Sequence, residues 1–203
     1  MTVSYLQPLA PIQIHYDIKK SEFITRIACI ETKQAMKDFV QQAKDDYPDA
    51  RHHCWAYVLG NPSQPESMAS SDDGEPSGTA GKPMLNVLSH KKIGNIGVVI
   101  IRYFGGIKLG AGGLVRAYSN ATQQAINALT LDIKEPMSHV VIDADFSQES
   151  QIRHFAQEYL AQIISVKYGD GLSMQLFIPL KHLDAFKACF QSSFGIKIHV
   201  DNQ

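Results

Sequence analysis

The 203-residue sequence predicts an α+β protein with two domains. Segments with the composition of β-strands alternate with amphipathic helical segments, and this periodicity breaks between Thr130 and Ser138. After the break, the segments follow the order βαββαβ. A hydrophobic content of 44% and a charged content of 19% are typical of soluble globular chains. We therefore place a first domain at residues 1–135 and a second at 136–203.

The first domain reads as a mixture of strands and helices. Residues 32–46 have apolar side chains at helical spacing, with Thr32 as the N-cap and Pro48 just past the end. Residues 96–104 are apolar on both faces, which predicts a central strand. The remaining segments are strands at 23–30 and 52–59, a loop at 61–78, and helices at 83–90 and 114–129.

The second domain shows a simpler pattern. The predicted strands are 140–146, 163–168, 172–178 and 196–200, and the predicted helices are 149–160 and 181–190. The sequence Gly169-Asp170-Gly171 indicates a hairpin between the second and third strands. This order is the ferredoxin-like pattern, which occurs with many functions and determines none of them.

Composition narrows the classes of function. The formal net charge is −1, so an anionic partner has to be met by a local basic patch. The apolar run 96–101 is far shorter than the ~20 residues of a membrane span, and the first six residues do not resemble a signal peptide. Cys29, Cys54 and Cys189 are odd in number and far apart. They fit reduced thiols, so we expect a cytoplasmic protein without membrane contact.

Residues 102–116 contain the densest motif, five glycines between a buried strand and a helix. Such a loop lets backbone amides approach a ligand, and the following helix N-terminus favours an anion. The candidate residues for binding an anion or nucleic acid are Arg102, Tyr103, Gly105, Gly106, Lys108 and Arg116.

Two nucleotide motifs fail in this loop. Residues 105–110 have P-loop spacing, but Ala111-Gly112 stands where Lys-Ser/Thr is required. Val115 occupies the third glycine position of a dinucleotide fingerprint. The loop is either an anion site or a structural turn that needs glycine for its backbone angles. Tyr103 and Phe104 could stack on bases, but one of the two must face the core.

A histidine cluster and an acidic cluster supply further candidates. His52 and His53 point to opposite faces of a strand, whereas His52 and Cys54 share a face. Two ligands do not make a zinc site, and we predict no metal and no cofactor. The carboxylates of residues 72–75 could do acid–base chemistry, or they could belong to a solvated loop that starts a helix. We treat as accessory candidates His52, His53, Asp72, Asp73, Glu75 and Lys82.

Four separated motifs in order resemble those of the IMPACT family. They are residues 51–54 (RHHC), 71–76 (SDDGEP), 78–83 (GTAGKP) and 102–110 (RYFGGIKLG). The stretch 81–110 also resembles the family signature in the spacing of its apolar residues. The first half resembles the family domain, and the second half resembles the ferredoxin-like domain that follows it in bacterial members.

The resemblance implies a fold for each domain and a connection with translation. It implies a first domain similar to domain 2 of ribosomal protein S5 and to domain IV of elongation factor G. It implies a second domain similar to domain V of that factor. Eukaryotic relatives act by protein–protein contact in a kinase pathway that controls translation initiation, so a connection with translation is implied. The family supplies no catalytic residues to carry over.

The leading hypothesis is a non-enzymatic cytosolic protein that binds RNA or the ribosome, or a translation-related protein. Arg102 and Lys108 would contact phosphates, Gly105 and Gly106 would permit close approach, and Arg116 would reach the same ligand or pair with the acidic loop. The sequence leaves open whether Arg102 is exposed or paired with a carboxylate, in which case it would be structural.

Two alternatives remain. The first is an enzyme or binder of a phosphorylated small molecule, with the glycine loop as phosphate cradle and Asp72, Asp73 or Glu75 as metal ligand or base. The second is a protein-interaction module whose loop binds an acidic peptide.

Overall fold

The computed structural model describes residues 3–190 and 196–201. The outermost residues of both expected domains, 1–2 and 202–203, lie outside this range. The chain forms two compact units, one spanning Ser4–Lys134 and one that contains the residues from Glu135 onward. The expected α+β class is confirmed by the mixture of helices and strands in the two units.

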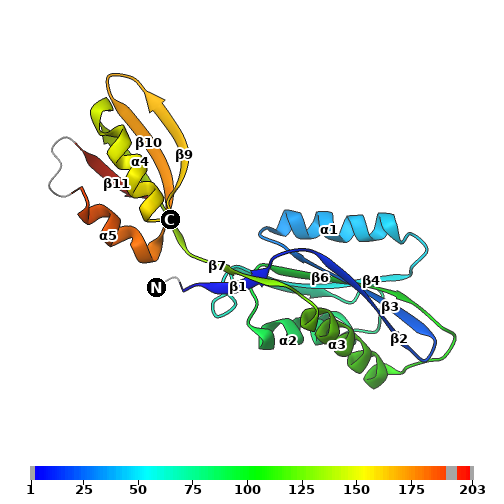
Figure 1. The fold of residues 1–203 in the computed structure, drawn as a ribbon. Coiled ribbons are helices and arrows are strands. Elements are labelled where there is room, and N and C mark those ends of the chain that lie inside the picture. Colours follow the sequence, from blue (N-terminus) through cyan, green and yellow to red (C-terminus); the bar gives the residue numbers. More distant parts are fainter. Residues whose placement is uncertain (1–2, 191–195, 202–203) are drawn as a thin grey trace. The chain divides into compact units, whose positions relative to one another are not determined.

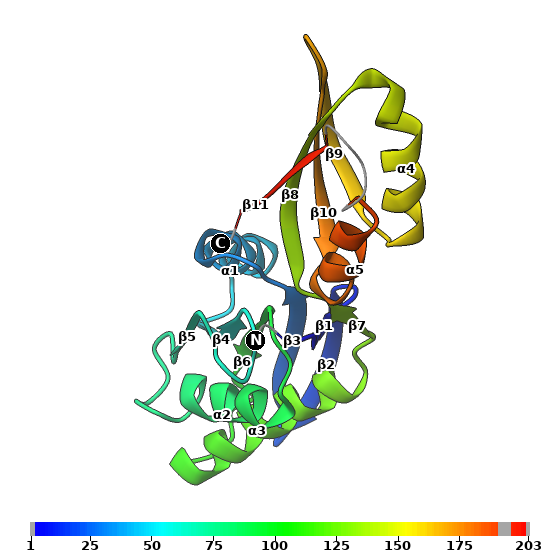
Figure 2. The same cartoon turned by 90° about the vertical axis from the view of Figure 1, so that its left-hand side faces the viewer.

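The first unit is a five-stranded antiparallel sheet with helices on both faces (Figure 1). Helix α1 (Lys33–Asp46) covers one face, and α2 (Gly81–Lys91) and α3 (Ala111–Asn127) pack side by side on the other (Figure 2). The strand order is β2 (Ile12–Ile18), β3 (Ser21–Cys29), β6 (Ile96–Tyr103), β4 (His52–Leu59), β5 (Ser67–Ser71). A separate two-stranded ladder joins β1 (Tyr5–Pro8) to β7 (Leu131–Lys134).

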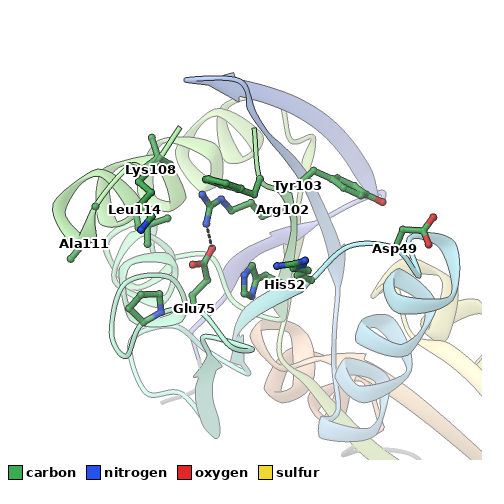
Figure 3. A pocket seen from close by; sticks show the side chains of 13 residues that line it. Asp49, His52, Glu75, Arg102, Tyr103, Lys108, Ala111 and Leu114 are labelled. Atoms are coloured by element: carbon green, nitrogen blue, oxygen red, sulfur yellow. Dashed lines mark hydrogen bonds and ion pairs between the residues drawn. The ribbon is translucent and has the colours of Figure 1, made fainter. Parts of the chain in front are cut away.

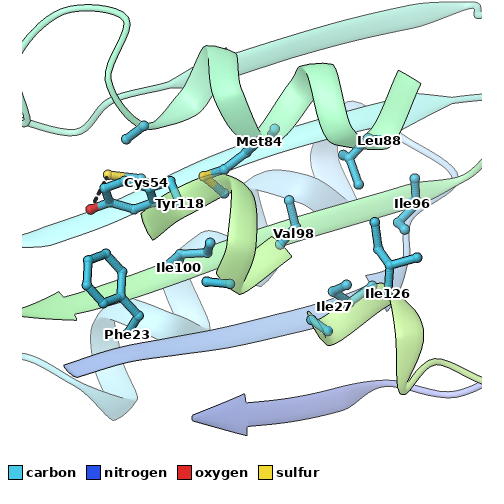
Figure 4. Packing of buried hydrophobic residues seen from close by; sticks show 14 of the residues in the cluster. Phe23, Ile27, Cys54, Met84, Leu88, Ile96, Val98, Ile100, Tyr118 and Ile126 are labelled. Carbon is cyan, nitrogen blue, oxygen red and sulfur yellow. Dashed lines mark hydrogen bonds between the residues drawn. The ribbon is translucent and has the colours of Figure 1, made fainter. Parts of the chain in front are cut away.

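Alternation along the central strand explains the two cores of this unit. Val98 and Ile100 of β6 face α2 and α3, in a cluster with Phe23, Met84 and Tyr118 (Figure 4). Val99 and Ile101 face α1 and pack with Met36 and Tyr57. Because both faces are covered, β6 is apolar from Ile96 to Ile101, and its predicted central position is correct.

The predicted elements differ from the structure mainly where strands are short. The loop expected at 61–78 contains the edge strand β5, whose Ser-Met-Ala-Ser-Ser sequence has little β-propensity and pairs only through β4. The strands β1, β2 and β7 were not predicted, although the alternation of apolar and polar residues along β2 is the pattern of a half-buried strand. Helix α3 begins at Ala111 instead of 114, so Gly112 and Gly113 lie in its first turn. The N-cap expected at Thr32 is confirmed, because its Oγ1 accepts the Ala35 amide at 3.0 Å.

The second unit is a four-stranded antiparallel sheet covered by two helices on one face. In chain order it contains β8 (Met137–Ala144), α4 (Glu149–Glu158), β9 (Gln162–Tyr168), β10 (Leu172–Pro179), α5 (Leu183–Ala188) and β11 (Lys197–Asp201). The spatial order is β11-β8-β10-β9. Leu183 and Phe186 of α5 pack on Ile142, Met174 and Leu176 of the sheet. No helix in the described part of the chain is long and apolar enough to cross a membrane.

Candidate functional site

A cleft of about 590 Å³ opens at one end of the five-stranded sheet (Figure 3). The end of β6, the beginning of β4 and the start of α3 meet here. The antiparallel register places Phe23, Arg102 and His52 in one row across β3, β6 and β4. The lining residues are Asp49, Arg51, His52, Glu75, Pro76, Arg102, Tyr103, Phe104, Lys108, Leu109, Gly110, Ala111 and Leu114.

The glycine loop reaches this cleft through a close backbone contact. A Cβ on Gly105 would lie 1.8 Å from the carbonyl oxygen of Lys20, so only glycine fits there. The Gly105 amide donates to Ser21 Oγ at 3.2 Å. Gly110 stands at the N-cap of α3 with φ of 71°, a left-handed value that glycine adopts readily. The loop therefore delivers the start of α3 to the cleft wall.

The N-terminus of α3 is open. No described side chain caps its first amides, and its first turn, from Ala111 to Leu114, contains no acidic residue. The amides of this turn and the helix dipole therefore present partial positive charge to the cleft. Lys108 lines the same wall and is exposed. Within the described residues, neither Lys108 nor Arg51 has an ion-pair partner, so both charges are available to a ligand.

Arg102 forms the floor of the cleft as a buried ion pair. Its Nη1 donates to Glu75 Oε1 at 2.6 Å, and the two side chains are 7% and 3% exposed. The guanidinium lies between the rings of Phe23 and Phe104, at 5.5 and 5.7 Å from their centroids. The question left open by the sequence is thus answered, because the charge of Arg102 is matched by Glu75.

A chain of buried polar groups continues from this pair into the core. The Tyr118 hydroxyl donates to Glu75 Oε1 at 2.8 Å, and the Cys54 thiol lies 3.3 Å from that hydroxyl (Figure 4). Burial raises the pKa of Cys54 to about 12 and also raises the pKa of Tyr118. Both groups are neutral at physiological pH, so Cys54 is neither a thiolate nucleophile nor a metal ligand in this state.

Asp72 organises the start of α2. Its Oδ1 accepts the amides of Ala80 and Gly81 at 3.0 and 2.8 Å, and its Oδ2 accepts the Gly78 amide at 2.7 Å. Burial opposes the charged form, but the three amides outweigh it and lower the pKa of Asp72. The carboxylate therefore replaces an N-cap, because the residue at that position is Ala80.

Asp73 and the two histidines hold the base of the acidic loop. Asp73 Oδ2 accepts the His53 amide at 2.7 Å, and the Asp73 carbonyl lies 2.9 Å from His52 Nδ1. Asp73 has a positive φ of 39°, which the loop imposes on it. His53 is buried on the α1 side, where burial lowers its pKa, and its Nε2 lies 3.2 Å from the carbonyl of Tyr47. As expected from alternation, His52 alone of the pair lines the cleft.

The other predicted residues divide between the cleft and the surface around it. Tyr103 lines the cleft and packs against the α1-side core, and burial raises its pKa. Gly106 has φ of 85° in open space. Arg116 is outside the cleft lining and donates from Nε to Gly112, without an acidic partner in the described chain. Lys82 lines a second, smaller groove between α2 and α3.

Sequence reasoning missed some cleft residues. Arg51 and Asp49 lie in the turn before β4, and Figure 3 places Asp49 at the far end of the cleft from Lys108. Phe104 is 55% exposed, so it, and not Tyr103, is the freer of the two aromatics. The arginine next to the histidines was a signal, but only the folded sheet shows which end of β4 meets the glycine loop. Within the described residues no cluster of three or more His, Cys, Asp or Glu side chains could hold a metal.

Comparison with known proteins places these motifs in a family. The profile of the Impact N-terminal domain matches residues 19–126, which include both loops and all cleft residues. The chain is 40% identical to an IMPACT family member of Haemophilus influenzae over 91% of this chain and 89% of that protein. It is also 40% identical to the IMPACT family member YigZ of Escherichia coli over 91% of each chain. A relative in Bacillus subtilis, YvyE, is 35% identical over 83% of this chain and 77% of its own.

A solved structure agrees with this assignment. The crystal structure of a hypothetical protein superposes with a TM-score of 0.78 at 36% identity and covers 98% of both chains. The chain therefore belongs to the IMPACT family. The likeness of the units to ribosomal protein S5 and elongation factor G stays a prediction.

Proposed function

We propose that this chain is a non-enzymatic, cytoplasmic RNA-binding protein that contacts phosphates of structured RNA, such as ribosomal RNA, at the cleft. The observation that carries the proposal is the open N-terminus of α3 beside Lys108 on one cleft wall. Backbone amides at a helix start together with a free cation form a ready anion site. Arg51 adds a second free cation, and Arg102 neutralises the one carboxylate on the floor.

An exposed aromatic side chain favours RNA among anionic ligands. Phe104 borders the cleft with more than half of its surface exposed, and its inner side is supported by the Arg102 guanidinium. An aromatic ring held in this way is a stacking surface for a base next to the bound phosphate. Phosphate contact and base stacking on one surface are the usual combination in proteins that bind single-stranded or looped RNA.

The acidic loop supports a non-enzymatic role. Asp72 accepts three backbone amides, Asp73 accepts the His53 amide, and Glu75 accepts from Arg102 and Tyr118. These hydrogen bonds hold the loop and the start of α2, so each of the three carboxylates has a role in the fold.

The proposal is tested by binding of a short fluorescein-labelled RNA hairpin to the full chain, measured by anisotropy over a series of salt concentrations. Lys108→Ala is expected to weaken binding about tenfold and to reduce the slope of log affinity against log salt by about one, because one phosphate contact is lost. Arg116→Ala is the matched control, since it removes one cation that lies outside the cleft. Affinity that is independent of salt, or equal losses in both variants, would contradict the proposal.

Sedimentation of a cell lysate through a sucrose gradient tests whether the RNA partner is the ribosome. The tagged protein is expected to migrate with ribosomal particles at low salt and to remain at the top of the gradient at raised salt or with Lys108→Ala. Arg102→Ala is unsuitable for this purpose, because it removes half of a buried ion pair and affects the fold as well as the site.

The dimensions of the cleft favour a second candidate, a phosphorylated small molecule. A volume of about 590 Å³ lies in the range of small-molecule sites. A thermal-shift screen with adenosine nucleotides and sugar phosphates separates the two. Stabilisation by one of these compounds that Lys108→Ala abolishes, together with no binding of the RNA hairpin, would establish the small molecule instead.

A further inference from the structure

The turn between β2 and β3 has an unusual composition. The two strands pair up to Ile18 and Ser21, so the hairpin is closed by two residues, Lys19 and Lys20. Their φ angles are 47° and 63°, both in the left-handed region. Two-residue hairpins with this backbone favour Asn-Gly, and lysine is strained at both positions. Local turn formation therefore does not explain why two lysines stand here.

This turn is fixed against the glycine loop. The Cα of Gly105 packs directly on the Lys20 carbonyl, and the Gly105 amide donates to Ser21 Oγ. Nη2 of Arg102 lies 3.5 Å from the same Ser21 oxygen, and Ser21 is fully buried. The turn and the first half of the glycine loop thus form one continuous rim beside the cleft.

The two lysines of the rim, Lys19 and Lys20, are exposed and without an ion-pair partner among the described residues. The acids of the same hairpin, Asp17 and Glu22, face each other in register on the opposite side of the strands from Ser21. Glu22 is also held by His15 at 2.9 Å. The nearest hairpin carboxylates therefore form no direct ion pair with the two lysines.

We propose that the Lys19–Lys20 turn is a second phosphate-contacting element, and that the ligand is an RNA strand whose successive phosphates span the turn and the cleft. This inference rests on the proposed function of the cleft. The cations of the rim and of the cleft wall come from separate segments, the turn before β3 and the loop before α3. A ligand with one phosphate group engages one of these places, whereas a polymer backbone engages both. Two lysines occupy the turn despite the backbone strain, although a neutral Asn-Gly pair would form the same turn more easily. A role in binding phosphate accounts for their presence.

The deciding variant is Lys19→Asn/Lys20→Gly, because it removes both charges while giving the turn its preferred residues. It is expected to melt at or above the wild-type temperature, so loss of binding cannot be ascribed to unfolding. Affinity for the labelled RNA hairpin is expected to fall about tenfold or more, with a salt slope smaller by about two. Lys19→Arg/Lys20→Arg retains the charge and is expected to bind like the wild type.

A matched control removes the same charge elsewhere. Lys33→Ala/Lys37→Ala takes two exposed lysines from α1, on the other face of the sheet, and is expected to leave the salt slope unchanged. Competition tests the length of the ligand, since unlabelled hairpin is expected to displace the probe at far lower concentration than ATP.

The outcomes separate the inference from the proposed function. If Lys108→Ala weakens binding and Lys19→Asn/Lys20→Gly does not, the cleft binds RNA and the turn takes no part, which overturns the inference alone. Equal losses in the turn and α1 variants overturn it as well, because they indicate a general charge effect. If the wild type shows no salt-dependent binding, the proposed function fails and the inference fails with it.

Discussion

The acidic loop at residues 72–75 and the glycine loop at residues 105–113 are the two richest motifs of the chain, and both contribute residues to one cleft. In the acidic loop every carboxylate accepts hydrogen bonds from the protein itself. In the glycine loop, Lys108 and the first amides of α3 have no such partner among the described residues. The carboxylates of the acidic loop have hydrogen-bond donors within the protein, whereas Lys108 and the first amides of α3 are available to a ligand.

This contrast separates residues that maintain the fold from residues that meet a ligand. A buried polar group without a partner is costly, so the carboxylates of a structural loop are paired. A cation that awaits a ligand stays exposed and unpaired. Arg102 belongs to the glycine motif in sequence but to the acidic loop in structure, because its partner is Glu75. Motif membership alone does not assign a role.

The largest change in stability is expected when the buried ion pair of Arg102 and Glu75 is broken. Arg102→Ala leaves Glu75 charged and buried with only the Tyr118 hydroxyl as donor, and we expect a loss of about 3–5 kcal/mol in the free energy of unfolding. Urea denaturation followed by circular dichroism measures it. Arg102→Met/Glu75→Leu removes both charges and is expected to lose less than the single variant. A single variant as stable as the wild type would show that the pair is not structural.

A smaller change in stability is expected from substitutions in the glycine loop. Gly105→Ala places a Cβ against the Lys20 carbonyl, so we expect the free energy of unfolding to fall by about 2 kcal/mol or more. Gly112→Ala is the matched control, since its Cβ meets open space in the first turn of α3 and helix propensity favours alanine by up to about 1 kcal/mol. Thermal melts of the two variants should move in opposite directions. Equal shifts would remove the argument from close backbone contact.

The smallest expected effect is a pH dependence at Asp72. Its pKa is lower in the folded than in the unfolded chain, so its contribution to stability is complete above the unfolded value of about 4 and is lost as pH falls through the folded value. Asp72→Asn should be less stable than the wild type at neutral pH. The two curves of melting temperature against pH should converge at acid pH, once Asp72 is protonated in the folded chain as well. Parallel curves would show that the carboxylate charge is not what holds the start of α2.

Sequence reasoning recovered most of the first unit because its long elements carry strong patterns. The apolar segment that became β6 and the amphipathic segment that became α1 were indicated by periodicity alone. The strands β1, β5 and β7 are four or five residues long and depend on a partner, so no local pattern marks them. The same limit holds at the site, where Lys19 and Lys20 join the glycine loop only through the antiparallel pairing of β3 with β6.

The sequence by itself determined the α+β class, the family motifs and the residue types gathered near the cleft. Spacing along the chain is enough for these, because helix and strand periods and glycine requirements are local properties. Only the tertiary structure decided which charges are neutralised. Arg102 and Glu75 are separated by the whole of α2 and meet through the sheet, whereas Lys108 meets no carboxylate in the described chain. Pairing depends on through-space distance and burial, and neither can be obtained from the order of residues.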